Sequence, residues 1–65
     1  MHPKNNNQLR QRIAYEAARM MVEDAVSDVA VARRKAAGRM GVHNHRLWPS
    51  NAEVQEALYR QQQLF

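Results

Sequence analysis

Residues 12–42 read RIAYEAARMMVEDAVSDVAVARRKAAGRMGV, and the spacing of apolar side chains along this stretch predicts two helices with a break between them. The apolar repeat begins at Leu9, from which side chains at helical spacing fall on one side of the chain. We therefore expect a first helix over about residues 7–25 and a second helix over about residues 28–40.

The second helix carries its own start and end signals. Ser27 suits the N-cap position, and Asp28 suits the positively charged first turn. Gly41 suits the left-handed conformation that follows many helices. Gly38 lies inside the expected helix at a cost of about 0.5–1 kcal/mol relative to alanine, which indicates either a close backbone contact or a loose last turn. The side chains expected to share one face are Val29, Ala32, Ala36 and Met40.

A third helix is predicted over residues 51–64. Ser50 and Glu53 have the spacing of a capping box, and Pro49 precedes them. Its expected apolar side consists of Val54, Ala57, Leu58, Leu64 and Phe65. Three helices joined by an ordered loop over residues 41–50, without a credible strand, predict a small all-α three-helix bundle.

The chain is long enough for one domain only. We expect a flexible lead-in over residues 1–6, in which Asn6 or Asn7 caps the first helix, and a single helical domain over residues 7–65. A chain of 65 residues without cysteine has a thin core and no disulfide to support it. This shortage favours a homodimer or a larger protein partner.

The first helix has a second apolar stripe opposite the first one, formed by Tyr15, Ala18, Val22 and Val26. A helix that is apolar on two sides lies between two other helices or offers one side to a partner. Tyr15 and Val22 are therefore candidate interface residues. Two ion pairs are expected along the exposed edge of this helix, Arg12 with Glu16 and Arg19 with Glu23.

The positive charge is concentrated in the middle of the chain. Ten Lys and Arg residues against six Asp and Glu residues give a net charge of +4, and no acidic residue lies between Asp28 and Glu53. The basic side chains in this interval are Arg33, Arg34, Lys35, Arg39 and Arg46. Such a cluster is either a solvated helix face or a binding surface for an anionic partner.

The segment RRKAAGRMGV, residues 33–42, is similar to the end of the first helix of a helix-turn-helix motif. That motif turns within three or four residues, whereas eight residues separate Gly41 from Ser50 here. The third helix also has Glu53 and Glu56 near its start, where recognition helices tend to offer basic or amide side chains. The alternative is a capped helix end followed by an ordered loop.

The loop VHNHRLWPS, residues 42–50, has two interpretations. Trp48 either closes the core or forms an exposed anchor with Arg46, because Trp and Arg dominate binding hot spots and also stack on unpaired bases. His43 and His45 have H-x-H spacing, but a stable metal site needs three or four ligands, so we expect no metal.

The residue pattern does not indicate a catalytic site. The chain has no cysteine nucleophile, its two serines are helix caps, and its two glycines lack the spacing of a phosphate-binding loop. We expect no enzymatic activity, no cofactor and no small-molecule substrate. The sequence has neither a membrane span nor a secretory signal, so a cytoplasmic, soluble protein is expected.

Residues 12–42, the loop and PSNAEVQEALYRQQQLF, residues 49–65, together resemble a small uncharacterised bacterial helical family that occurs near or joined to nucleotidyltransferase-type proteins. The resemblance covers about residues 10–65. It implies an accessory helical module and carries no catalytic residue into this chain. The family has an aromatic residue after its Ser-Asp cap, where this sequence has Val29.

These observations predict a non-enzymatic binding protein that acts through protein–protein interaction. Its predicted surface combines the basic face of the second helix with the Arg46–Trp48 loop. The alternative is a nucleic-acid-binding protein that makes mainly phosphate contacts. The protein partner is favoured by the second apolar stripe, by four methionines that suit adaptable interfaces, and by the small core.

Overall fold

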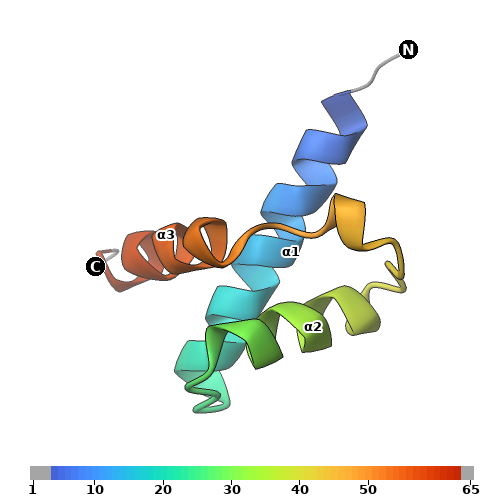
Figure 1. Ribbon diagram of the computed structural model, residues 1–65. Coiled ribbons are helices and arrows are strands. Elements are labelled where there is room, and N and C mark those ends of the chain that lie inside the picture. Colours follow the sequence, from blue (N-terminus) through green and yellow to red (C-terminus); the bar gives the residue numbers. More distant parts are fainter. Residues whose placement is uncertain (1–3, 64–65) are drawn as a thin grey trace.

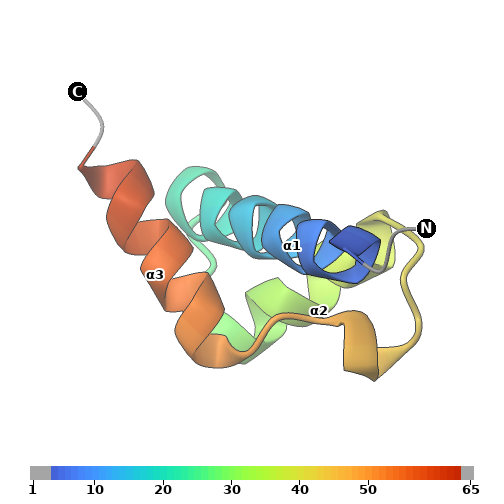
Figure 2. The same ribbon diagram turned by 90° about the horizontal axis from the view of Figure 1, so that it is seen from above.

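The computed structural model describes residues 4–63, with side chains from residue 7 onward, and it confirms a small all-α three-helix fold. Helix α1 spans Lys4–Glu23, α2 spans Val29–Arg39 and α3 spans Asn51–Gln62. A short 3-10 helix, η1, spans His45–Leu47 in the connection between α2 and α3. Figure 1 shows α1 running along the height of the molecule, and both α2 and α3 pack against it. Figure 2 shows the same arrangement from above, with η1 beyond the end of α2.

The core is built mainly from small side chains. Alanine allows helix backbones to approach closely, so a thin protein can bury its helix faces with few large residues. The largest fully buried side chains are those of Ile13, Val54 and Pro49. The buried cluster consists of Ile13, Ala14, Ala17 and Met20 of α1, Ala32, Ala36 and Ala37 of α2, and Val54 of α3.

Helix α1 begins and ends earlier than predicted. It begins at Lys4, so Asn6 and Asn7 lie inside the helix and the prediction that one of them is its cap is wrong. Helix α1 includes residues 4–6 of the predicted lead-in, and residues 1–3 lie outside the described part of the chain. The helix ends at Glu23 because Ala25 takes a left-handed conformation, with φ of 56°, that a right-handed helix does not accommodate.

Helix α2 is capped by a different residue from the one predicted. Asp28, not Ser27, is the N-cap, and its carboxylate accepts a hydrogen bond of 2.9 Å from the backbone N–H of Ala30. The prediction at the other end is confirmed, because Gly41 follows the C-cap Met40 with φ of 72°. The Gly41 and Val42 N–H groups donate to the carbonyls of Gly38 and Ala37 at 3.1 and 2.9 Å, which is the pattern of a Schellman motif.

The start of α3 is as predicted. The Ser50 hydroxyl accepts from the Glu53 N–H at 3.1 Å, and the Glu53 carboxylate accepts from the Ser50 N–H at 2.7 Å, so the capping box is complete. The helix ends at Gln62, and the predicted apolar residues Leu64 and Phe65 lie outside the described residues. No helix within residues 4–63 has the length and apolar character needed to cross a bilayer.

Candidate functional site

Trp48 closes the loop onto the core. It is half-buried, packs against the buried cluster, and donates a hydrogen bond of 2.9 Å from its indole N–H to the Val42 carbonyl. The core-closing interpretation of this residue is therefore the one that the structure supports. The indole N–H is already hydrogen-bonded within the chain, and this bond holds the orientation of the ring.

Two side chains lie close to the indole ring of Trp48. The His45 ring stacks on Trp48 with centroids 4.0 Å apart and an interplanar angle of 30°. The guanidinium of Arg33 lies 5.5 Å from the Trp48 ring centroid, a distance at which a cation is attracted to an aromatic face. Arg33 also donates to the Pro49 carbonyl at 3.2 Å and is half-buried. Arg33 therefore ties α2 to the loop and is not a free side chain of the predicted basic face.

Three exposed basic side chains of the predicted surface have no ion partner in the described part of the chain, namely Arg34 and Lys35 on α2 and Arg46 on η1, and we call them the basic surface. Arg34 and Lys35 point away from the core because the alanines of α2 occupy its inner face. Arg46 is exposed on a turn held by the Asn44 side chain, whose Oδ1 accepts from the Arg46 N–H at 3.0 Å. Among residues 7–63, none of these three side chains lies within 4.0 Å of a carboxylate.

Arg39 is exposed but forms an ion pair with Glu16. Its guanidinium lies 3.3 Å from a Glu16 oxygen, and Arg19 contacts the other oxygen of Glu16 at 3.6 Å. The predicted pair between Arg12 and Glu16 is therefore wrong, because α2 supplies a competing arginine that the sequence of α1 cannot reveal. The predicted pair between Arg19 and Glu23 is confirmed at 3.4 Å, and this hydrogen bond raises the pKa of Arg19.

The second apolar stripe of α1 is narrower than predicted. Ala18 is fully buried and Val26 is half-buried against the core, whereas Tyr15 and Val22 are 54% and 53% exposed. Tyr59 on α3 is a further exposed aromatic residue that was not predicted, and it is 63% exposed. A helical-wheel count would have found it, because position 59 falls opposite the apolar side of α3.

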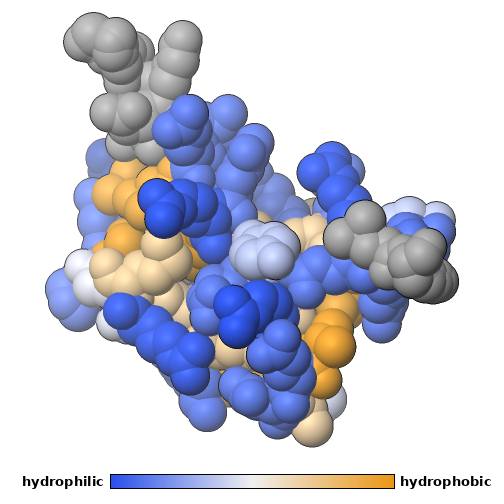
Figure 3. Space-filling view, turned by 180° about the vertical axis from the view of Figure 1, so that it is seen from behind, coloured by the Kyte–Doolittle hydropathy of each residue, from blue (hydrophilic) through white to orange (hydrophobic). Residues whose placement is uncertain are grey.

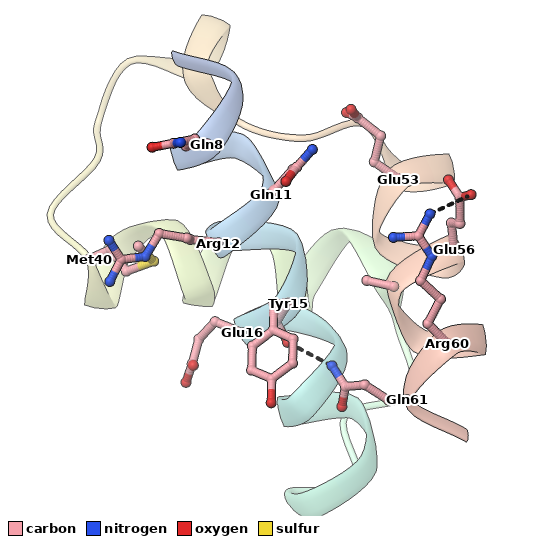
Figure 4. A pocket seen from close by; sticks show the side chains of 11 residues that line it. Gln8, Gln11, Arg12, Tyr15, Glu16, Met40, Glu53, Glu56, Arg60 and Gln61 are labelled. Carbon is pink, nitrogen blue, oxygen red and sulfur yellow. Dashed lines mark hydrogen bonds and ion pairs between the residues drawn. The ribbon is translucent and has the colours of Figure 1, made fainter. Parts of the chain in front are cut away.

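A groove of about 1070 Å³ lies between α1 and α3 (Figure 4). Tyr15 forms part of the α1 wall, and Glu56 and Gln61 belong to the α3 wall. The Gln61 amide donates to the Tyr15 carbonyl at 3.1 Å, and Arg60 pairs with Glu56 at 3.3 Å. Most of the residues that line the groove are therefore of polar types, and several of their polar groups already have partners within the chain.

The face behind the view of Figure 1 is mostly hydrophilic (Figure 3). Its hydrophobic areas are small and are separated by hydrophilic surface. Large exposed apolar patches mark stable protein interfaces, so this appearance does not favour a broad apolar interface on the face in view.

The start of α3 differs from a DNA-reading helix. Met40–Ser50, eleven residues, separates α2 from α3, whereas a helix-turn-helix uses a turn of three or four residues. Glu53 belongs to the capping box at the start of its own helix, and it also forms an ion pair with Arg10 of α1 at 3.2 Å. The hydrogen bond from the Ser50 backbone and the charge of Arg10 lower the pKa of Glu53, so its carboxylate stays charged. This paired carboxylate stands where recognition helices tend to offer basic or amide side chains.

The described residues contain no group of three or more His, Cys, Asp or Glu side chains placed to hold a metal ion. Comparison with protein families, with curated proteins and with solved structures finds no match to this chain.

Proposed function

We propose that this chain is a small accessory binding module of the cytoplasm, which holds an acidic partner on its basic surface rather than catalysing a reaction. The observation that carries this proposal is the exposure of Arg34, Lys35 and Arg46 in a stretch of chain that contains no acidic residue from position 29 to position 52. Cations without a nearby carboxylate keep their full attraction for an approaching anion.

The reasons to prefer an acidic protein as the partner are weaker in the folded chain than in the sequence. Met20 is buried, and Met21 and Met40 pack against the core, so these methionines fill the interior. The second apolar stripe is reduced to Tyr15 and Val22. What supports an anionic partner of either kind, an acidic protein or the phosphates of a nucleic acid, is the basic surface itself.

The test compares two double variants with the same net charge. Arg34→Ala with Lys35→Ala removes two cations of the basic surface, and Arg12→Ala with Arg60→Ala removes two cations outside it. Both changes lower the net charge from +4 to +2. Retention on an immobilised polyglutamate or heparin matrix is measured as a function of salt.

We expect the first double variant to lose most of its retention and to show a shallower salt dependence, because fewer counterions are released on binding. The second double variant should keep most of its retention. Equal losses in the two variants, with unchanged helicity by circular dichroism, would show that only the total charge matters and would refute the proposal.

A second candidate function is association through the exposed face of α1. The observation in its favour is that Tyr15 and Val22 lie seven residues apart on the same side of α1 and are each more than half exposed. The solution mass, measured by light scattering at about 50 and about 500 mM salt, tests this association, because apolar contacts persist at high salt whereas charge contacts are screened.

Tyr15→Ala and Val22→Ala should each lower an oligomeric mass while the chain stays folded. Tyr59→Ala is the matched control, because Tyr59 is similarly exposed but lies on α3. A monomer mass for the unmodified chain at both salt concentrations would exclude association through this face, and an equal effect of Tyr59→Ala would show that the α1 face is not specific.

A further inference from the structure

We propose that the partner of the basic surface is a single-stranded nucleic acid, one of whose unpaired bases stacks on the His45 ring while its phosphates contact the basic surface. This inference rests on the proposed function, because it names the class of partner for the same site. Three features of the loop carry it.

The first feature is an exposed aromatic ring that is already held in place. His45 is exposed, and one side of its ring stacks on the indole of Trp48 at 4.0 Å. The indole cannot easily turn, because its N–H is bonded to Val42 and its body packs against the core. A ring that is ordered before the ligand arrives loses little conformational freedom on binding, so a base that continues the stack binds at a lower entropic cost.

The second feature is the charge around this ring. Arg46 follows His45 directly in the chain. The exposed Arg34 adjoins Arg33, whose guanidinium lies 5.5 Å from the centroid of the same indole. The carboxylate of Glu53 is turned toward its own helix start and toward Arg10, with which it pairs at 3.2 Å. A phosphate backbone that places a base on His45 therefore runs among cations.

The third feature is the geometry of the connection, which suits a single strand better than a duplex. A single ring at the start of a short 3-10 helix stacks only on a base that is not already stacked between neighbours. Helix α3 begins with an acidic capping box and follows an eleven-residue connection, so it is not arranged to enter a major groove. Polyglutamate carries negative charge but no aromatic ring, so it cannot stack on His45.

The experiment exploits the single tryptophan of the chain, which lies next to the proposed contact. The chain is titrated with an oligothymidylate of about eight nucleotides, a length within the site sizes typical of single-strand binders. Parallel titrations use polyglutamate and a duplex, each matched in total charge. We expect the oligothymidylate to change the Trp48 fluorescence and to bind more tightly than either competitor.

Substitution of the ring separates stacking from charge. His45→Ala should weaken oligothymidylate binding about 5- to 150-fold, the range that loss of one base–aromatic stack implies, and should leave polyglutamate binding unchanged. His45→Phe should restore most of the affinity, because it keeps an aromatic ring. His43→Ala is the matched control, since His43 is also exposed but is not part of the described stack, and it should bind like the unmodified chain.

The outcomes distinguish this inference from the proposed function. Equal affinity for polyglutamate and oligothymidylate, or equal effects of His45→Ala and His43→Ala, would overturn the stacking inference and leave the basic surface as the site for an acidic protein. Tighter binding of the duplex would overturn the preference for single strands. Loss of binding in the Arg12→Ala, Arg60→Ala variant but not in the Arg34→Ala, Lys35→Ala variant would overturn the proposed function, and this inference with it.

Discussion

The two glycines at the end of α2 should respond to alanine with opposite signs. Gly38 lies within α2, is exposed, and a Cβ built on it meets no atom within 4 Å. Gly41 also has open space around it, but its φ of 72° is one that residues with a side chain rarely adopt. The two substitutions therefore add the same methyl group without a clash and differ only in backbone conformation.

The magnitudes follow from backbone preferences. Alanine at position 38 should stabilise the fold by about 0.5–1 kcal/mol, because glycine costs that much inside a helix. Alanine at position 41 should destabilise it by about 1–2 kcal/mol, the cost of the left-handed conformation for a residue with a Cβ. An unfolding entropy of about 2.1 cal/mol/K per residue gives about 0.14 kcal/mol/K for the whole chain. The expected Tm changes are therefore increases of about 4–7 °C for Gly38→Ala and decreases of about 7–15 °C for Gly41→Ala.

Thermal unfolding followed by far-UV circular dichroism measures both changes under identical conditions. A lower Tm for Gly38→Ala would mean that something approaches this position closely, which contradicts the open space seen there. An unchanged Tm for Gly41→Ala would mean that the left-handed turn does not end α2, and the account of the Schellman motif would be refuted.

Three further predictions concern other parts of the fold. Ala25→Gly should raise the free energy of unfolding by up to about 1 kcal/mol, because glycine adopts the left-handed conformation of this position without strain. Urea titrations measure this change, and a destabilised variant would contradict the reasoning. Trp48→Phe should lower the free energy of unfolding by about 1–2 kcal/mol, because the Val42 carbonyl loses its indole donor, and urea unfolding followed by circular dichroism measures the loss. Since the pKa of Glu53 is lowered in the folded chain, its ionisation stabilises the fold above the usual carboxyl pKa, and this contribution disappears as the pH falls through the lowered value. The difference in unfolding free energy between the unmodified chain and Glu53→Gln should therefore be larger at about pH 7 than at about pH 3, and an equal difference at both would show that the carboxylate charge contributes nothing.

Local signals explain which parts of the fold were predictable. The all-α class, the Ser50–Glu53 capping box and the end of α2 at Gly41 depend on neighbours in sequence, and all three are confirmed. The end of α1 was predicted too late, because nothing in the local sequence marks Ala25 as left-handed, and only the need to turn back onto α1 places it there.

The candidate site was predictable in composition but not in the contacts that its members make. The sequence shows the cluster of cations between Asp28 and Glu53, and Arg34, Lys35 and Arg46 are exposed in the structure. It does not show that Arg33 lies over the indole of Trp48 and donates to the Pro49 carbonyl, because these contacts join α2 to the far end of the loop that follows it.

Short-range patterns in the sequence were therefore enough to establish the number of helices, the end of α2, the start of α3 and the location of positive charge, because periodicity, capping and net charge are properties of short segments. Helix packing, in contrast, selected which of the charged and aromatic side chains remain exposed. Arg39 meets Glu16 across two helices, and Trp48 turns inward to Val42 while His45 stays outside. Such choices depend on which segments pack together, and the free energy that selects among them comes from burial and pairing between residues far apart in the chain.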